Sequence, residues 1–230
     1  MFKREIQKSI LADFKRKKVI VLLGARQVGK TTLLLSLKSD KEKVLLLNCD
    51  NIDDRLSLEE RTSTELKYLF SSYDMAFIDE AQRVKNIGLT LKMIGDLKLD
   101  TQIVVTGSSS FDMANEINEP ATGRLIEYNL YPFSLAELAA DTSEREEKRL
   151  LENRLIYGLY PEVVTEPADA KRTLMSLTNN YLYKDLFSYK GLKKPDVIQK
   201  LVRALALQLG SEVSYNELSN LLGIDKETVE

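Results

Sequence analysis

The sequence predicts an α/β fold with a doubly wound, mainly parallel sheet, followed by a helical region. Three observations carry this prediction. Short aliphatic runs without polar alternation recur along the first half of the chain, as in strands that are buried on both faces. Helical patterns separate these runs, and a glycine-containing turn joins the first run to the helix that follows it. Alternating strands and helices favour a parallel sheet with helices on both sides.

An amphipathic helix is expected within residues 1–18. The apolar residues Ile6, Ile10, Leu11 and Phe14 recur there at helical spacing. Its outer face is expected to be basic, because the segment holds seven cationic residues: Lys3, Arg4, Lys8, Lys15, Arg16, Lys17 and Lys18. A solvated surface is the favoured interpretation, and contact with a polyanion is the alternative.

Five strands and three intervening helices follow. The strands are expected at 19–23, 44–47, 75–78, 103–105 and 125–128. The helices are expected at 31–38, 62–70 and 87–97. Thr62 and Glu65 have the spacing of a capping box, which fixes the start of the second helix.

The pattern changes after the fifth strand. Ser134 and Glu137 predict another capping box, at the start of a helix over 134–157 that is interrupted near 141–143. Two prolines, Pro161 and Pro167, break the chain before a further helix at about 169–188.

The last part of the chain is expected to be helical as well. Pro195 precedes a Leu- and Ala-rich helix over 196–209. Ser214 and Glu217 cap a short helix, Gly223 lies in a tight turn, and Asp225 begins another helix. We therefore expect three parts: a core at 1–133, a helical lid or linker at 134–194, and a truncated helix-turn-helix, winged-helix-like segment at 195–230.

Composition excludes several classes of protein and chemistry. The 230 residues include one cysteine, Cys49, and no histidine. An internal disulfide, a cysteine zinc site and histidine-based catalysis are therefore ruled out. The apolar runs are shorter than the roughly 18 residues of a membrane helix, so no membrane is expected. The net charge of −2 argues against a protein that coats nucleic acid. The expected location is the cytoplasm.

The glycine-containing turn fits the phosphate-binding pattern G-x-x-x-x-G-K-[ST]. It lies between an expected strand and an expected helix and reads Gly24, Ala25, Arg26, Gln27, Val28, Gly29, Lys30 and Thr31. Glycines allow backbone N–H groups to face a polyphosphate. Lys30 would reach the β- and γ-phosphates, and the Thr31 hydroxyl would ligate Mg²⁺. The alternative is an ordinary strand–helix turn with a buried lysine stem.

Two adjacent carboxylates give a second, independent indication. Asp79 and Glu80 end the apolar strand that starts at Met75. Asp79 lies where a Mg²⁺ partner is expected, at the carboxyl end of a buried strand. Glu80 is expected to orient or deprotonate an attacking water. Together with the phosphate loop, this pair predicts an NTPase that hydrolyses with its own base.

A polar sensor is expected after the fourth strand. Ser108 is the first choice, with Thr106 and Ser109 as rivals, and helix capping by these residues is an equal alternative. Arg124 is the other candidate near the γ-phosphate, in its own or in a neighbouring subunit. A structural ion pair explains Arg124 equally well.

Together these residues resemble the AAA-like P-loop ATPase family of bacteria and archaea. The resemblance covers the whole chain and rests on short motifs in a fixed order: 24–32, 77–82, 106–109, 123–124, 130–134, 158–162 and 181–185. It implies ATP as the ligand, adds Thr32 to the nucleotide-binding residues, and implies slow hydrolysis. In the family this core is joined to a winged-helix region and to a C-terminal domain of uncertain, nuclease-like function.

The end of the chain departs from the family pattern. Family members continue well past the point that corresponds to Glu230, so a truncated reading frame or a fragment is expected. The last six residues are net negative and short, which disfavours reading of DNA by a recognition helix. A protein-packing role of these helices is the favoured interpretation.

Three functions remain open at this stage. The leading hypothesis is a Mg²⁺-dependent ATPase that acts as a motor or switch, and an oligomer fits it. The second is a nucleotide-sensing module with negligible turnover, whose C-terminal helices contact a protein partner. The third is a DNA-binding regulator with a vestigial ATP site.

Overall fold

The computed structural model describes residues 2–39, 41–108, 123–179 and 195–229. Ser109, Pro120 and the 181–185 motif lie outside these ranges, as does the second half of the helix expected at 169–188. The chain divides into two compact units, Met1–Ala170 and Lys171–Glu230.

The first unit is built on a five-stranded parallel sheet with the order β2-β3-β4-β1-β5. The strands are β1 (Val19–Gly24), β2 (Val44–Asn48), β3 (Met75–Asp79), β4 (Gln102–Gly107) and β5 (Leu125–Leu130). All five strands predicted from the apolar runs are present. The order puts β4 between β3 and β1, so the carboxyl ends of all three meet at one edge of the sheet.

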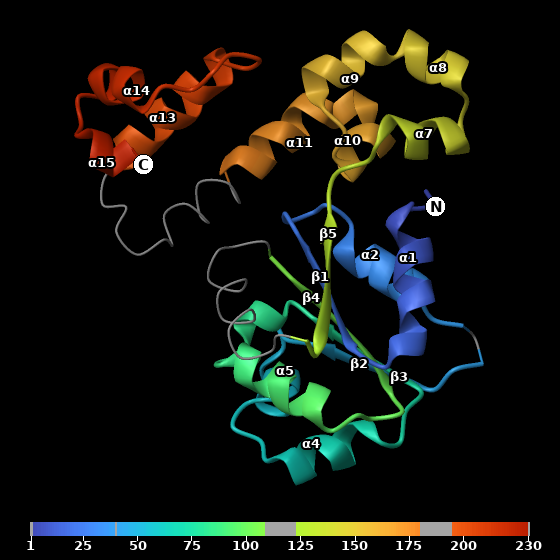
Figure 1. Cartoon of the computed structure of the whole chain (residues 1–230). Helices are drawn as coiled ribbons and strands as arrows, with labels where there is room; N and C mark the ends of the chain where they lie inside the picture. The colour runs from blue at the N-terminus through green and yellow to red at the C-terminus, as the bar shows by residue number, and fades with distance from the viewer. Residues whose placement is uncertain (1, 40, 109–122, 180–194, 230) are drawn as a thin grey trace. The chain divides into compact units, whose positions relative to one another are not determined.

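Helices cover both faces of this sheet (Figure 1). On one face lie α1 (Ile6–Asp13) and α2 (Lys30–Ser36), and on the other lie α4 (Ser63–Phe70) and α5 (Ile87–Asp96). Successive residues of β1 alternate between the two cores: Ile20 packs with the α1 and α2 side, and Val21 with the α4 and α5 side. This burial on both faces explains why the strands are apolar throughout. A short helix that was not predicted, α3 (Ile52–Leu56), follows β2.

The N-terminal segment differs from its prediction at one residue. The helix forms, and most of its cationic side chains are exposed. Arg4, however, is buried, with 9% of its surface exposed. It is therefore not part of a solvated basic face, because its guanidinium is bonded inside the protein.

Helices follow β5 in the order α7 (Leu135–Asp141), α8 (Glu144–Arg149), α9 (Leu151–Tyr157), α10 (Pro161–Thr165) and α11 (Ala170–Leu177). The predicted capping box of Ser134 and Glu137 is present, and so is the interruption at 141–143. A further break at Leu150 separates α8 from α9.

The second unit has its own small core. Its helices α13 (Pro195–Leu207), α14 (Tyr215–Leu222) and α15 (Lys226–Val229) bury Ala204, Leu218 and Leu222. Gly223 ends α14 in the left-handed conformation, as expected for a helix-turn-helix turn. The described part of this unit contains no strand, so a wing is not seen there. The three-part division of the chain stays a prediction.

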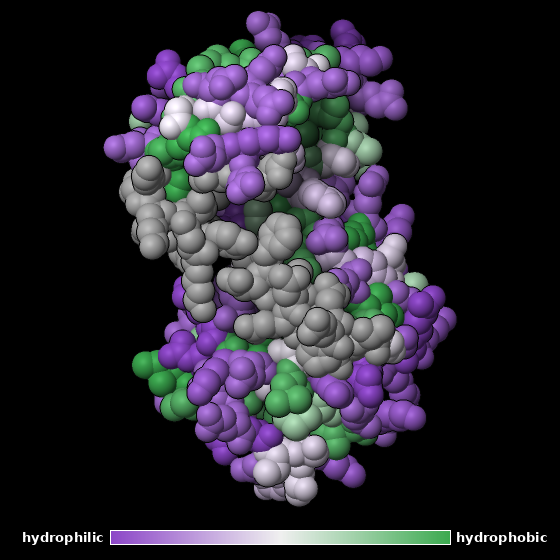
Figure 2. Space-filling model, turned by 60° about the vertical axis from the view of Figure 1, so that its left-hand side comes forward, coloured by the Kyte–Doolittle hydropathy of each residue, from purple (hydrophilic) through white to green (hydrophobic). Residues whose placement is uncertain are grey.

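Figure 2 shows mostly hydrophilic side chains on the described surface of one face, with hydrophobic ones in small separate groups. Among the described helices, none combines the length and the apolar character needed to cross a membrane.

Candidate nucleotide site

The phosphate loop connects the end of β1 to the start of α2. Gly24 is required by close packing, because a Cβ there would lie 2.5 Å from the carbonyl oxygen of Leu130 in β5. Gly29 has a φ of 96°, which favours glycine. The Val28 side chain is fully buried in the core, so only its backbone remains for a ligand. Arg26 is half-buried and Gln27 is exposed.

Lys30 lies at the centre of this loop. Its side chain is buried, and its Nζ donates hydrogen bonds of 3.0 Å to the carbonyls of Gly24 and Ala25. The loop therefore curls around the ammonium group. Thr31 and Thr32 follow it in α2 and are exposed.

Two hydroxyls hold the carboxylate of Asp79. Thr31 Oγ1 donates a hydrogen bond of 2.8 Å to Asp79 Oδ2, and Thr106 Oγ1 donates a short one to Asp79 Oδ1. Thr106 also accepts a hydrogen bond of 3.1 Å from the N–H of Glu80. Residues from α2, β3 and β4 are thus joined in one chain of hydrogen bonds. The rival Thr106 thus contacts both carboxylate residues.

The backbone conformation of Glu80 and a hydrogen bond from Gln82 orient its side chain. Its backbone is in the left-handed region with a φ of 55°, an unfavourable conformation that is common at functional sites. Gln82 Nε2 donates a hydrogen bond of 2.6 Å to Glu80 Oε2, and Gln82 Oε1 accepts one of 3.3 Å from the N–H of Ser108. Ser108 therefore contacts the Glu80 carboxylate through Gln82, which sequence reasoning had not assigned a role.

Two hollows meet at the phosphate loop. The first, of about 480 Å³, is lined by the loop, Glu80 and α10: Gln27, Gly29, Lys30, Thr31, Thr32, Glu80, Pro161, Glu162, Thr165 and Glu166. The second, of about 450 Å³, is mainly apolar and includes Phe2, Arg4, Phe133 and Pro161. The hollows share Gly29, Thr32, Pro161 and Thr165. A polar hollow beside the phosphate loop thus adjoins a mainly apolar one.

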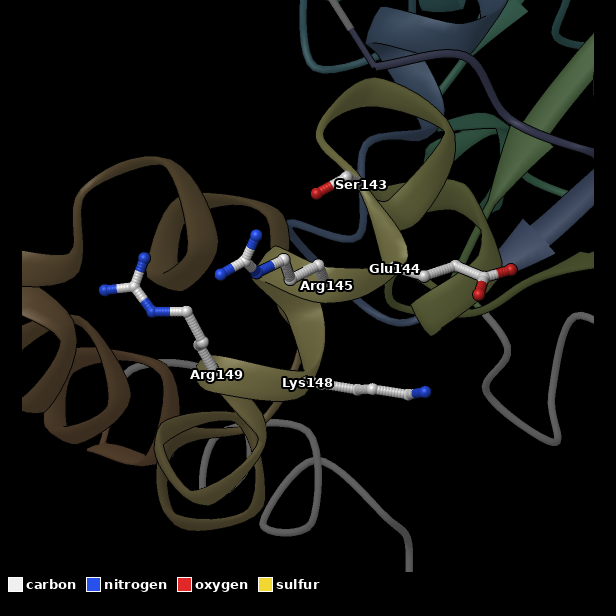
Figure 3. A pocket seen from close by; sticks show the side chains of 5 residues that line it. All are labelled: Ser143, Glu144, Arg145, Lys148 and Arg149. Carbon is white, nitrogen blue, oxygen red and sulfur yellow. The ribbon is translucent and has the colours of Figure 1, made fainter.

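A separate hollow of about 660 Å³ lies over α8 (Figure 3). Arg145 and Arg149 extend to one side of the helix, while Lys148 and Glu144 extend to the other. Arg149 is also paired with Glu146 at 2.9 Å. Because the cationic groups do not converge on one point, this hollow is a poor anion site.

Arg124 was predicted near the γ-phosphate of its own or of a neighbouring subunit, and the structure places it away from the phosphate loop of its own chain. Arg124 precedes β5, and its carbonyl accepts a hydrogen bond from Val19, the first residue of β1. It therefore lies at the opposite edge of the parallel sheet from Lys30. Its guanidinium is paired with Asp96 at the end of α5, which is the structural alternative considered for it. A contact with a neighbouring subunit's nucleotide stays a prediction.

The chain's cysteine takes no part in chemistry at this site. Cys49 is buried, and its backbone N–H donates a hydrogen bond of 2.9 Å to the carbonyl of Asp79. Burial, followed by the negative charge of Asp54, raises the pKa of Cys49 to about 12. The thiol is therefore protonated at neutral pH and is a poor nucleophile.

We expect Thr106→Val to slow turnover about tenfold while ADP affinity stays within threefold. Valine keeps the shape but removes the hydroxyl that orients Asp79 and accepts from Glu80. The unpaired Glu80 N–H should also cost about 1–3 kcal/mol of unfolding free energy. Phosphate release and urea unfolding measure the two effects.

Thr101→Val is the matched control for this variant. Thr101 is also buried, and its hydroxyl donates to the carbonyls of Phe70 and Tyr73, but it precedes β4 at the edge of the sheet away from the site. The Thr101→Val variant should lose about as much unfolding free energy as Thr106→Val, but its turnover per folded molecule should not change. Equal turnover in the two variants would show that Thr106 is structural only.

Known proteins resemble this chain in sequence. Residues 16–139 match the family described as AAA domain, and residues 148–230 match a domain of unknown function, DUF8612. A curated protein of Haemophilus influenzae is 25% identical over 245 residues, covering 96% of this chain and 60% of that protein. The Methanocaldococcus jannaschii protein MJ1637 is 25% identical over 273 residues, covering 100% and 56%. Both relatives are described as uncharacterized, and the chain spans 56–60% of their length.

A solved structure supports the fold. The Walker-type ATPase PABY2304 of Pyrococcus abyssi superposes with a TM-score of 0.60 and 14% identity, covering 100% of this chain and 89% of that chain. At that identity the likeness concerns the fold alone. The family match covers more than half of the chain, and it agrees with the parallel sheet and the phosphate loop. The chain belongs to the AAA domain family and is a prokaryotic AAA-like P-loop ATPase by fold.

Proposed function

We propose that this chain binds ATP with Mg²⁺ and hydrolyses it slowly to ADP and phosphate, as a switch or motor. The observation that carries this proposal is the hydrogen bond from Thr31 to Asp79 beside the loop that surrounds Lys30. This bond joins Thr31, just after the phosphate loop, to Asp79, the last residue of β3.

The oxygens at this edge fit Mg²⁺. Thr31 Oγ1 and Asp79 Oδ2 are 2.8 Å apart, and both are hard oxygen donors. Among the described residues, no group of three or more acidic, cysteine or histidine side chains is arranged so that it could hold a metal ion by itself. The two oxygens of Thr31 and Asp79 suit Mg²⁺, which takes one or two protein ligands and completes its shell with phosphate oxygens and water. Thr31 and Asp79 would hold it, and it would neutralise charge on the phosphates.

The loop supplies the phosphate contacts. Backbone N–H groups between Gly24 and Gly29 would surround the phosphates, with Arg26 and Gln27 at the rim. The Lys30 ammonium would exchange its bonds to loop carbonyls for bonds to phosphate oxygens. Thr32 and Ser108 remain further candidates for contact, since Thr32 lines both hollows and Ser108 adjoins Gln82.

Glu80 is the proposed general base. Glu80 lines the phosphate hollow, and its carboxylate would accept a proton from the attacking water. The hydrogen bond from Gln82 fixes the carboxylate orientation before substrate arrives. The Asp79 carboxylate has both oxygens engaged by hydroxyls, so it is less suited to take that proton.

The apolar hollow would receive the adenine ring. Phe2 and Phe133 contact each other there, with ring centroids 4.8 Å apart and ring planes tilted by 45°, and Pro161 borders both hollows. An apolar slot beside a phosphate loop lets one ligand bury its base and expose its phosphates to the cation. The C-terminal helices are the proposed surface for a protein partner, and DNA binding is the weaker alternative.

Steady-state phosphate release tests this proposal. We expect turnover of ATP that requires Mg²⁺, is lost on chelation, and is not dependent on added nucleic acid. Tight ATP binding without turnover would instead favour the nucleotide-sensing module. Tight DNA binding that survives Lys30→Ala would favour the regulator with a vestigial site. Absence of ATP binding would contradict the proposal.

A further inference from the structure

Arg4 is a buried cation that the proposed hydrolysis does not use. Its side chain is 9% exposed, and Glu137 in α7, which is 6% exposed, pairs with it at 3.0 Å. A buried charge is retained at a cost unless its hydrogen bonds are satisfied. Here every guanidinium nitrogen donates at least one bond within the protein.

The guanidinium joins segments that are far apart in the sequence. Nε donates to Glu137, Nη1 donates to the carbonyl of Val28 in the phosphate loop at 3.2 Å, and Nη2 donates to the carbonyl of Tyr131 after β5. Its carbon Cζ lies 4.8 Å from the centre of the Phe133 ring. A planar fork with directed donors can make such a set of bonds, whereas a lysine ammonium cannot make it in the same geometry.

The bond to Val28 determines the orientation of a group that faces the ligand. In a planar trans peptide, the carbonyl of one residue and the N–H of the next point in opposite directions. Holding the Val28 carbonyl toward Arg4 therefore directs the Gly29 N–H away from Arg4. Gly29 lines the phosphate hollow, and its φ of 96° allows this peptide orientation.

Glu137 extends this arrangement into α7. Its Oε1 also accepts a hydrogen bond of 2.9 Å from the N–H of Glu5, and its Oε2 accepts one of 3.0 Å from the N–H of Ser134. The same carboxylate thus completes the α7 capping box and anchors the N-terminal segment. The buried ion pair of Arg4 and Glu137 therefore contacts both the phosphate loop and the start of α7.

We propose that Arg4 is a positioning residue for the phosphate loop and that, through Glu137, it couples phosphate binding to the segment Tyr131–Leu138. The proposal rests on the proposed nucleotide binding and deepens it. Arg4 acts through the Val28–Gly29 peptide and not as a ligand of the base. Phosphate binding then orders both the loop and the start of α7.

The test compares two probes, ATP and inorganic tripolyphosphate, each with Mg²⁺. The main variant is Arg4→Met combined with Glu137→Gln, which removes both buried charges together and keeps an acceptor for the capping box. We expect the Kd of both probes to rise at least tenfold. Glu137→Gln alone leaves the donors of Arg4 in place and should lose less affinity. Arg16→Met, at an exposed arginine paired with the half-buried Asp13, is the control for loss of one positive charge.

Each outcome decides the proposal. A loss confined to ATP would mean that Arg4 contacts the base in the apolar hollow, and this would overturn it. Unchanged affinity for both probes would overturn it as well. If the wild type binds neither probe, the proposed function itself fails, which the wild-type titration shows before any variant is tested.

Hydrogen exchange tests the coupling and identifies a merely structural effect. In the wild type, tripolyphosphate should slow amide exchange in residues 24–31 and in residues 131–138. In the double variant, saturating tripolyphosphate should protect only the first segment. Protection of both segments in the double variant would contradict the coupling. Protection of the loop alone in the wild type would contradict it too.

Discussion

Lys30→Ala is expected to raise the Kd for ATP at least about 100-fold, which corresponds to a loss of about 2.7 kcal/mol or more of binding free energy. Bonds from an ammonium to phosphate oxygens are charge-assisted, and each contributes roughly 1.5–3 kcal/mol. The loop surrounds this ammonium, so the substitution removes the charge at the centre of the site. Titration with a fluorescent ATP analogue measures the effect.

The unfolding midpoint of this variant should stay close to that of the wild type. The carbonyls of Gly24 and Ala25 lose a donor, but water in the adjoining open hollow can replace it. Lys38→Ala removes an exposed lysine just after the same helix and should leave the Kd unchanged. Wild-type affinity in Lys30→Ala would contradict the phosphate-loop assignment.

Glu80→Gln is expected to lower turnover about 100-fold or more while ATP affinity is retained. The amide has the size of the carboxylate and can still accept the hydrogen bond from Gln82, but it cannot take a proton at neutral pH. Single-turnover phosphate release separates the chemical step from binding.

The matched control is Glu162→Gln. Glu162 lines the same hollow from α10 but is not part of the hydrogen-bonded chain of Asp79 and Thr106. Turnover of the Glu162→Gln variant should therefore stay within about threefold of wild type. Asp79→Asn provides the opposite pattern, with loss of Mg²⁺-dependent binding. If Glu80→Gln keeps normal turnover while Asp79→Asn loses Mg²⁺-dependent ATP binding, Glu80 is not the base.

Much of the fold could be predicted because its information is local. Met75 to Ile78 is apolar at every position, which identifies a strand buried on both faces, and the structure confirms it. Thr62 and Glu65 cap their helix through contacts three residues apart. The phosphate loop has fixed spacing between Gly24 and Lys30, so it could also be recognised within one short segment. The short helix α3 was missed because its five residues show no periodicity that distinguishes it from a loop.

The choice among hydroxyls required the sheet. Thr106, Ser108 and Ser109 are equivalent in the sequence as polar residues near a strand end. Parallel register pairs Ile78 with Val105, which puts Thr106 beside Asp79, while Ser108 lies past the end of β4 and contacts Gln82. Side-chain contact between neighbouring strands depends on register, which a single strand's sequence does not contain.

The sequence by itself determined the alternation of strands and helices, the phosphate loop, and the carboxylates at the end of β3, because each depends on residues a few positions apart. Only the tertiary structure decided the places of Arg4 and Arg124. Both are arginines in charged or polar segments, yet one is buried against Glu137, 133 positions away, and the other pairs with Asp96 at the far edge of the sheet. The physical reason is that the environment of a guanidinium depends on which distant segments of the chain fold next to it. The local spacing of residues does not specify those segments.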